Sequence, residues 1–402
     1  MNLVKICVNI SDADFGFEQN ERNDIKMDKK LKCAVVGLGL LGTRHSEFLW
    51  NFPRTELVAI CDIKEEKLRD FLNKHKVMTY TDCKEMYKNE NLDLVVVATQ
   101  DPYHKEPVLE ACRAKLPYVI CEKPLTTTIP DANEIIEAAK KNDTKIYVLF
   151  PNRFYPLDNA IRILVKNRYL GTPSYGEMRL DDNISVPMTL WGTNSKLFAS
   201  ISSPAYFLLS HAVDLLRFYF EPHEVNKVYA IGKKGIVGSY VDYVDAYLTF
   251  DNGLTMRLKS EWSKYMKPLV EFYVQLTGTN GGFVYNKAPG FGCKQGLRFD
   301  LNCKEEDVKE IQKLLISKGI KSNVIIASEG INKNSLELYV EEGNDFIWDN
   351  GIGHYIDAIL GEKNEMHLIT DIMGGYYQVK VVDAILKSIL TGKEVEISYK
   401  AI

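Results

Sequence analysis

Short apolar runs alternate with longer amphipathic stretches through the first third of the chain. Runs that are apolar at every position are typical of strands buried on both faces of a parallel sheet. They predict strands at 33–36, 57–61, 94–98, 118–121 and 146–150. The stretches between them predict helices at 43–51, 64–74, 104–114 and 131–141. Because strands and helices that alternate in this order form a doubly wound parallel sheet, we expect an α/β domain over residues 31–150.

The pattern changes after Pro156, where longer β-rich runs replace the alternation. They predict strands at 175–180, 225–231, 240–250, 254–262 and 271–277. Asp251-Asn252-Gly253 separates two of these runs and is a hairpin signal, and strands joined by hairpins form a mostly antiparallel sheet. Helices are also predicted at 157–168, 205–220 and 373–390, with Gly392 as the stop signal of the last one, and residues 181–203 look like a loop. We expect an α+β domain over residues 151–402 and a polar N-terminal extension at 1–30, which we assign no function.

A glycine motif follows the first predicted strand. It has the pattern GxGxxG and runs through Gly37, Leu38, Gly39, Leu40, Leu41 and Gly42. Such glycines permit a tight turn out of the strand, the approach of a pyrophosphate to the backbone, and close packing of the next helix on the sheet. The start of that helix presents free N–H groups to the phosphates. The motif alone is weak evidence, because a glycine-rich turn in another α/β unit also fits it.

An acid at the end of the second strand strengthens this interpretation. Asp62 stands twenty residues after Gly42, at a position where a carboxylate binds the hydroxyls of the adenosine ribose. Asp62 would repel a 2′-phosphate on that ribose, and Ile63 beside it carries no positive charge. We therefore predict a Rossmann domain that prefers NAD to NADP, although Lys64 could turn toward a phosphate.

The loops that follow the strands are expected to meet in one cleft, because ligands bind such sheets at the carboxyl ends of the strands. Beyond the glycine loop and Asp62, we expect these residues at the cofactor: Thr99, His104, Glu122, Lys123 and Arg153. Pro124 favours extended geometry for Lys123 at the mouth of its strand. An ammonium there stabilises charge that develops on a substrate oxygen, although a single lysine after a strand is more often solvated.

A histidine and an aspartate share a helical face further along the chain. His211 and Asp214 are three residues apart within the predicted helix 205–220. Histidine titrates near neutral pH, so it is suited to exchange a hydroxyl proton as acid or base. The other interpretation of His211 is a core histidine satisfied by a neighbour, and from these residues alone that is the commoner case.

Together these motifs resemble the Gfo/Idh/MocA oxidoreductases. The matching stretches are Gly37–Gly42, Thr99 to His104, Glu122-Lys123-Pro124, Asn152-Arg153-Phe154-x-Pro156, His211-x-x-Asp214, Gly278-Thr279-x-Gly281 and residues 384–395. The resemblance implies a nucleotide-binding domain and a substrate domain with an open sheet, whose face often serves for oligomerisation. It implies that Lys123 contacts cofactor and substrate and that His211 is the acid/base. We also expect Arg153, Tyr155 and Asp214 at the substrate.

Two features depart from the family pattern. The family usually has a carboxylate four residues before the histidine, and this chain has Phe207 there, which removes a partner that would orient the imidazole or relay its proton. The segment 303–343 is an insertion that the family does not require, with a helix predicted at 305–317 and strands at 324–327 and 336–340. A surface elaboration is the favoured interpretation of this insertion, and the alternative is a lid or an oligomer contact.

Composition bears on the class of function. The net charge is −4 without a dense basic block, so nucleic acid is not an expected partner. We expect no membrane span and no export signal, because no apolar run approaches the roughly 20 residues that cross a bilayer and the N-terminus lacks a secretory pattern. The eight cysteines are scattered without a CxxC pair, which argues against disulfides and a metal site and fits a reducing cytoplasm.

The sequence thus predicts a cytoplasmic NAD(P)-dependent oxidoreductase that acts on a sugar, a cyclitol or a related polyol or ketone. A homo-oligomer through the C-terminal sheet is also expected. Two alternatives keep the fold. One is a regulatory protein that binds the cofactor without turnover, which Phe207 favours and which intact Lys123 and His211 disfavour. The other is an NAD-dependent glycosidase that works through a transient ketone.

Overall fold

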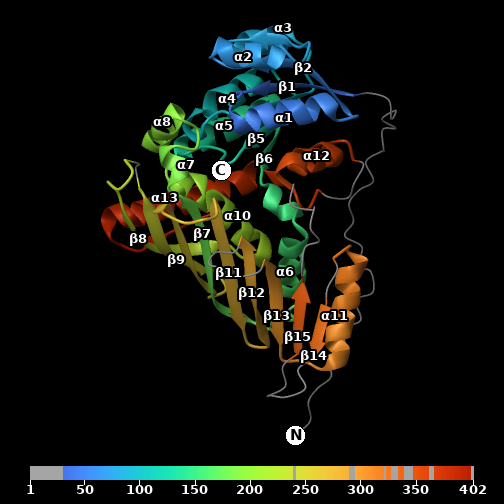
Figure 1. Ribbon diagram of the computed structural model, residues 1–402, viewed down its shortest axis with the longest axis vertical. Coiled ribbons are helices and arrows are strands. Elements are labelled where there is room, and N and C mark those ends of the chain that lie inside the picture. Colours follow the sequence, from blue (N-terminus) through green and yellow to red (C-terminus); the bar gives the residue numbers. More distant parts are fainter. Residues whose placement is uncertain are drawn as a thin grey trace.

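The computed structural model contains two sheets with helices packed around them (Figure 1). It describes residues 30–238, 241–288, 295–320, 323–326, 334–338, 347–361 and 366–399. The predicted N-terminal extension lies, except for Lys30, outside these ranges. Within them, none of the helices combines the length and the apolar sequence that a membrane span requires.

The first sheet has seven strands in the order β16-β6-β5-β4-β1-β2-β3. Six of them run parallel: β1 (Leu31–Val36), β2 (Thr55–Cys61), β3 (Met78–Tyr80), β4 (Leu94–Val97), β5 (Tyr118–Glu122) and β6 (Lys145–Leu149). The connecting helices are α1 (Leu40–Asn51), α2 (Glu65–Leu72), α3 (Cys83–Asn89), α4 (Lys105–Arg113) and α5 (Ile129–Asn142). The predicted Rossmann domain is confirmed. β3 and α3 are additional to the predicted elements, because a strand of 3 residues and a short polar helix carry little periodic signal.

Alternate residues of the central strands enter two separate cores. On β1, Cys33 and Val35 pack on one face of the sheet, and Ala34 and Val36 pack on the other. All four side chains are buried. Burial on both faces explains why these strands are apolar at every position.

The C-terminal part of the chain returns to the first sheet. There α12 (Ile347–Ile359) packs on α1, β16 (Thr370–Asp371) pairs antiparallel with β6, and α13 (Ile372–Thr391) lies against α5 and β6. The hydroxyl of Tyr355 on α12 donates to the carbonyl of Val148 on β6 at 2.7 Å. The unit expected over residues 151–402 therefore shares its last elements with the Rossmann sheet.

The second sheet has ten strands in the order β14-β15-β13-β12-β11-β7-β10-β9-β8-β17. They are β7 (Pro173–Asn183), β8 (Val225–Lys233), β9 (Tyr243–Phe250), β10 (Thr255–Lys264), β11 (Val270–Gly278), β12 (Gly281–Ala288), β13 (Gly296–Leu301), β14 (Asn323–Ile326), β15 (Asn334–Leu338) and β17 (Val395–Glu396). Within the described ranges, neighbours run antiparallel except β7 and β10, as the prediction of a mostly antiparallel sheet requires. The sequence pattern did not predict β12 and β13. For β12 the reason is that glycines at its start weaken a strand pattern.

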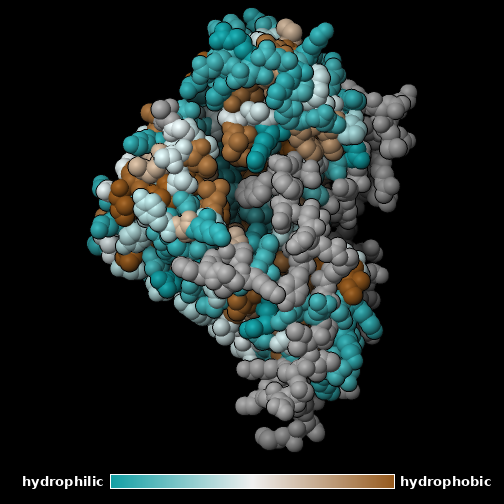
Figure 2. All heavy atoms as spheres, in the orientation of Figure 1, coloured by the Kyte–Doolittle hydropathy of each residue, from teal (hydrophilic) through white to brown (hydrophobic). Residues whose placement is uncertain are grey.

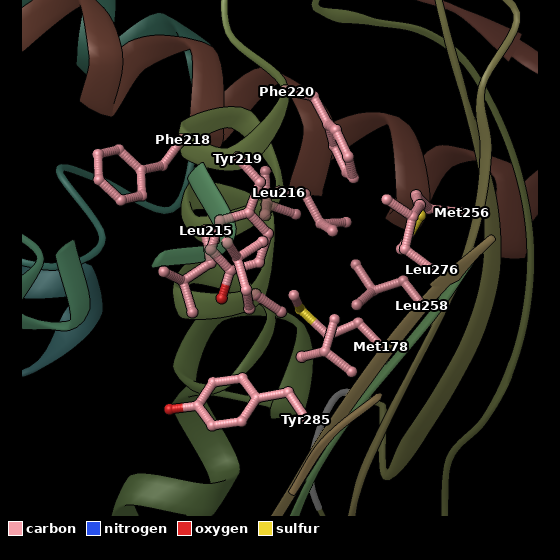
Figure 3. Close-up of a cluster of buried hydrophobic side chains, with 14 of the residues drawn as sticks. Met178, Leu215, Leu216, Phe218, Tyr219, Phe220, Met256, Leu258, Leu276 and Tyr285 are labelled. Carbon is pink, nitrogen blue, oxygen red and sulfur yellow. The ribbon is translucent and has the colours of Figure 1, made fainter. Parts of the chain in front are cut away.

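In the described part of the chain, the helices that pack on one face of this sheet include α6 (Pro156–Lys166), α10 (Leu209–Phe220) and α13. Figure 3 shows side chains of the sheet that point toward α10: Met178, Met256, Leu258 and Leu276. Full burial of one such side chain contributes roughly 1.5–3 kcal/mol. Among the residues that the structure describes, no element covers the opposite, open face, and three of its tyrosines are exposed: Tyr175, Tyr229 and Tyr247.

The segment 181–203, expected as a loop, needs correction. It contains the end of β7 and the helices α7 (Ser185–Met188) and α8 (Thr193–Ile201). Tertiary contacts hold α8 in place, since Phe198 packs against Trp262 of β10. A polar composition hides such a helix from pattern analysis, because its stability comes from packing rather than from propensity.

The insertion extends the edge of the second sheet. Its helix α11 (Glu305–Ser317) has the predicted bounds, and β15 pairs with β13 on one side and with β14 on the other. Val308, Ile311 and Leu315 of α11 are buried in the same core as the sheet. The described part of the insertion is thus packed into the edge of the domain. A lid or an oligomer contact stays a hypothesis.

The packing of α11 can be tested with two adjacent leucine-sized residues. Leu315→Ala should lower the free energy of unfolding by roughly 2–5 kcal/mol, because it removes a fully buried side chain. Ile316→Ala is the matched control, since Ile316 is 55% exposed and its loss should change stability by less than about 0.5 kcal/mol. Denaturant melts give both values. Equally small losses of stability in both variants would show that α11 is not part of the core. NADH affinity should be unchanged in both variants.

Candidate active site

The three glycines of the motif have different surroundings. Gly37 has a positive φ of 92°, and a Cβ there would lie 2.8 Å from the backbone of Ala98. A Cβ on Gly42 would lie 1.7 Å from the carbonyl oxygen of Gly37. A Cβ on Gly39 would have nothing within 4 Å. Gly37 and Gly42 are therefore required by the packing of the loop, whereas Gly39 borders open space at the start of α1.

Asp62 is attached to the glycine loop. Its Oδ2 accepts the backbone N–H of Leu38 at 2.7 Å, and its Oδ1 accepts the backbone N–H of Lys64 at 2.9 Å. The ammonium of Lys67 lies 3.7 Å from Oδ2, so Lys67 rather than Lys64 forms an ion pair with this carboxylate. Ile63 is 85% exposed beside it. The helix start without a side-chain cap, the open space at Gly39 and the acid at the next strand fit a dinucleotide.

Glu122 and Lys123 lie at the carboxyl end of β5, and both side chains are buried. Glu122 Oε1 is 2.7 Å from His45 Nε2 on α1. Burial favours a higher pKa for the Glu122 carboxyl, but the hydrogen bond from His45 and nearby positive charges outweigh it, so the pKa is lowered. Glu122 therefore joins the start of α1 to the mouth of β5.

The ammonium of Lys123 reaches into the second domain. Its Nζ donates to the carbonyl oxygen of Phe207 at 2.8 Å and lies 4.1 Å from the centre of the Phe207 ring. Burial lowers the pKa of Lys123, and the charges of three carboxylates act in the opposite direction: Asp101, Glu122 and Asp182. A buried ammonium needs such partners, because an isolated charge away from water is costly.

A break in a helix makes the Phe207 carbonyl available. The helix expected at 205–220 is divided into α9 (Pro204–Phe207) and α10, with Leu208 between them. In a continuous α-helix the carbonyl of Phe207 would accept the N–H of His211. Here that N–H donates to Leu208 at 3.0 Å instead, and the carbonyl of Phe207 accepts Lys123. The continuous helix that the pattern predicts is therefore wrong at this point.

His211 lies in the first turn of α10, close to Lys123. Its Nδ1 is 3.4 Å from the side-chain amide of Asn152, and its ring meets Phe150 edge-on. Burial lowers the pKa of His211 well below the ordinary histidine value, and the charges of Lys123 and Lys287 lower it further. The imidazole is therefore neutral at neutral pH and can accept a proton.

Three predicted substrate residues have other partners in this arrangement. Arg153 donates to both carboxylate oxygens of Asp214, at 2.9 and 2.7 Å, and this buried pair joins the start of the second domain to α10. The hydroxyl of Tyr155 accepts from Gln295 at 3.0 Å, and the ring lies beneath Lys287. Contact of Arg153, Asp214 or Tyr155 with substrate stays a prediction.

The loop after β4 is tied to the loop after β5. His104 Nδ1 is 2.6 Å from the carbonyl oxygen of Pro124, and Nε2 is 3.0 Å from that of Thr99. Thr99 Oγ1 donates to the carbonyl of Tyr103 at 2.9 Å. His104 thus holds the position of the Lys123 loop, and a direct contact of Thr99 or His104 with cofactor stays a prediction.

Pattern analysis did not single out several residues of the site. Asp101 accepts the hydroxyl of Ser202 at 2.5 Å across the two domains. Asp182 is a buried carboxylate on β7. In the sequence, only the adjacent acid Asp181 could have drawn attention to this position. Around Phe207 lie further aromatic rings: Trp191, Phe198 and Trp262. Figure 2 shows apolar surface gathered over α7 and α8, which carry part of this aromatic wall.

The glycine loop yields a paired prediction. Gly39→Ala should leave the melting temperature unchanged and weaken NADH binding by about tenfold or more, because its methyl group meets no protein atom but occupies space for the pyrophosphate. Gly42→Ala should lower stability by roughly 1–3 kcal/mol, because its methyl group overlaps Gly37. Fluorescence titration and thermal melts measure the two effects. Unchanged NADH affinity in Gly39→Ala would contradict this assignment.

Comparison with known families gives two matches in succession. The oxidoreductase family with an NAD-binding Rossmann fold matches residues 31–150. The GFO/IDH/MocA C-terminal domain matches residues 159–284. The boundary between the two matches lies close to the end of β6.

Two curated proteins illustrate the similarity in sequence. Myo-inositol 2-dehydrogenase from Thermotoga maritima is 30% identical over 203 residues, which are 50% of this chain and 58% of that protein. The uncharacterised oxidoreductase YrbE from Bacillus subtilis is 26% identical over 233 residues, 56% of this chain and 66% of its own length. The similarity thus spans less than two thirds of either relative.

Solved structures share the fold over most of the chain. WlbA dehydrogenase from Bordetella pertussis, in complex with NADH and UDP-GlcNAcA, has a TM-score of 0.70 at 17% identity and covers 93% of this chain and 99% of its own. Scyllo-inositol dehydrogenase from Lactobacillus casei, with NAD(H) and scyllo-inositol, has a TM-score of 0.68 at 16% identity. The match covers 92% of this chain and 99% of that protein. Because both family models match in the expected order, the chain belongs to the Gfo/Idh/MocA family of NAD-binding oxidoreductases.

Proposed function

We propose that the protein transfers a hydride between NAD(H) and a carbon of a sugar, a cyclitol or a related polyol or ketone. The observation that carries this proposal is that Lys123 reaches from the end of β5 to the Phe207 carbonyl of the second domain, one helical turn before His211, and its charge lowers the pKa of that histidine. Both lie at the carboxyl end of the parallel sheet, where the glycine loop and Asp62 also lie. An ammonium and a neutral imidazole are the two groups that reversible oxidation of an alcohol needs.

The two residues have separate tasks in this reaction. The nicotinamide, when bound, supplies or accepts the hydride at the substrate carbon. Lys123 stabilises the negative charge that develops on the substrate oxygen, with N–H groups that are not used by Phe207. His211 takes the hydroxyl proton during oxidation and returns it during reduction. Its lowered pKa favours the proton-accepting form at neutral pH.

The aromatic wall favours this chemistry in a further way. Phe207, Phe198 and Trp191 form edge-to-face contacts beside the Lys123 ammonium. Apolar side chains exclude water, and electrostatic interactions are stronger where water is excluded. The wall therefore strengthens the interaction of Lys123 with a charged oxygen.

A substrate panel tests the proposal and its two alternatives. We expect NADH oxidation with an inosose or a keto-sugar, or NAD reduction with myo-inositol, scyllo-inositol or an aldose. Binding of NADH without turnover on any member of the panel would favour the regulatory alternative. Release of an aglycone from a glycoside without net change of NADH would favour the glycosidase alternative.

We also propose that the open face of the second sheet binds a second copy of the chain. The exposed tyrosines Tyr175, Tyr229 and Tyr247 support this proposal, because aromatic residues are enriched at protein interfaces. Arg257 and Asp245 form an ion pair of 2.7 Å beside them on the same face.

The choice of cofactor is the first prediction from this proposal. NADH should bind about tenfold or more tightly than NADPH, because the Asp62 carboxylate repels a 2′-phosphate. Asp62→Asn should reduce the difference, since it keeps a side-chain oxygen for Leu38 but removes the charge. Titration with both cofactors measures this, and tighter binding of NADPH by the unmodified protein would refute the preference. Lys67 is the cation placed to stabilise a phosphate there.

The roles of Lys123 and His211 give the second prediction. Lys123→Ala should lower kcat about a hundredfold while NADH affinity changes much less, because it removes charge stabilisation from the transition state. His211→Asn should lower kcat about a hundredfold to ten thousandfold. The pH profile of oxidation should also lose its acid limb, which we expect below the ordinary histidine range.

Two surface substitutions serve as controls for this experiment. Lys141→Ala and His223→Asn change the same residue types away from the cleft, and both should keep normal turnover. Near-normal turnover and an unchanged pH profile in His211→Asn would refute the assignment of the acid/base. Tyr206 or Tyr155 would then become the candidate proton carrier.

A further inference from the structure

Asp182 is a buried carboxylate with no assigned task. It lies on β7 with 2% of its surface exposed. Strand alternation directs Asp182 to the same side of the sheet as Met178 and Leu180, toward the helices. Within the described residues, no hydrogen-bond donor contacts its carboxylate. A buried carboxylate without a protein donor is a candidate for function where another charged group lies near it.

The neighbouring aspartate shows what an ordinary buried acid looks like in this sheet. Asp181 is fully buried but points to the opposite side, where Lys259 Nζ lies 3.0 and 3.1 Å from its two oxygens. Lys264 and Arg179 lie 3.7 and 3.4 Å away from it. Asp181 is thus neutralised by a network, and Asp182 is not.

The sheet is irregular where Asp182 stands. In the pairing of β7 with β10, Asp181 is opposite Glu261 and Asn183 is opposite Lys264. Two residues of β10, Trp262 and Ser263, therefore oppose the single residue Asp182. A bulge of this type re-aims side chains and is common beside active sites.

A chain of aromatic contacts leads from this bulge to Lys123. Trp262 packs on Phe198, Phe198 packs on Phe207, and Phe207 carries the Lys123 ammonium over its ring. Asp182 stands at the bulge where this chain of contacts begins, and its charge acts to raise the pKa of Lys123. The carboxylates that face Lys123 come from three elements: Asp101 of the 3₁₀ turn 101–103, Glu122 of β5 and Asp182 of β7.

Two of these three carboxylates already accept hydrogen bonds from other side chains. Asp101 accepts a hydrogen bond from Ser202, and Glu122 is bound to His45. We propose that Asp182 is a positioning residue whose carboxylate keeps the Lys123 ammonium charged and directed toward the reacting oxygen. Its effect on catalysis rests on the proposed function, but its effect on the charge of Lys123 does not.

The charges around Asp182 agree with this assignment. Burial raises the pKa of the Asp182 carboxyl to about 7, while Lys123 acts to lower it and Asp181 acts to raise it. Above that pH the carboxylate is charged and favours the protonated amine of Lys123. Burial disfavours that charge, and the neutral imidazole of His211 adds no charge of its own at neutral pH. Removing Asp182 should therefore bring the deprotonation of Lys123 to lower pH.

Lysine NMR tests this directly in the full-length protein. The Nζ atoms are labelled with ¹⁵N, and Lys123→Arg identifies the Lys123 signal. Asp182→Asn should lower the titration midpoint of Lys123 by roughly one pH unit, the effect typical of losing one nearby opposite charge. Asp182→Glu, which restores a carboxylate, should return the midpoint toward that of the unmodified protein. Asp181→Asn is the matched control and should leave the midpoint unchanged or slightly higher.

The outcomes separate this inference from the proposed function, because the titration needs no turnover. A lower midpoint in Asp182→Asn supports the role of Asp182 even when no substrate of the panel reacts. Where a substrate is found, the alkaline limb of its kcat/KM profile should move by the same amount. An unchanged midpoint in folded Asp182→Asn, or an equal fall in Asp181→Asn, overturns the proposal. If Asp182→Asn does not fold, the same titration of Asp182→Ser decides by the same criterion.

Discussion

The buried ammonium of Lys123 is the charge on which the arrangement of the site depends. A charge removed from water costs several kcal/mol unless hydrogen bonds and opposite charges compensate it. Lys123 obtains this compensation from the Phe207 carbonyl and ring and from three carboxylates. The carbonyl, the ring and Asp182 belong to the second domain. The state of this lysine is therefore a property of the two domains together.

Local backbone structure makes this contact possible. The break between α9 and α10 releases the Phe207 carbonyl from the helical hydrogen-bond ladder, and Lys123 becomes its donor. The same break places His211 in the first turn of α10. An aromatic residue at position 207 thus provides two contacts to the ammonium, one through its backbone and one through its ring. A carboxylate side chain in that place would have provided a direct charge instead.

Several contacts hold the two domains in a fixed relation around this charge. Arg153, in the turn that leaves the first sheet after β6, and Asp214 of α10 form a buried pair with two hydrogen bonds, so this pair ties the end of the first sheet to the helix that carries His211. Asp101 and Ser202 add a further hydrogen bond between the domains. The C-terminal segment contributes Tyr355 and β16 to the Rossmann sheet. These links come from residues far apart in sequence, so Lys123 and His211 are held in place by the whole fold.

The sequence alone determined the features that depend on local pattern. Apolar runs identified the buried strands, because burial on both faces leaves no polar position, and the bounds of α11 followed from its periodicity. The glycine motif with Asp62 indicated the dinucleotide site, since each of its residues has a backbone or charge requirement of its own. Lys123 was singled out at the end of a predicted strand and His211 on the face of a predicted helix, and the resemblance of the surrounding motifs to a family supplied their expected roles.

Only the tertiary structure decided the partners of these residues. The pairing of Arg153 with Asp214 and the isolation of Asp182 depend on which strands and helices lie together, and the chain order does not specify this. β12 became a strand through its pairing with β11 and β13, although its glycines weaken the local pattern. β16 joined the first sheet from a segment more than two hundred residues beyond β6. Long-range hydrogen bonds and packing outweigh local preference at such positions, and for that reason the sequence pattern indicated candidate residues of the site but not their contacts.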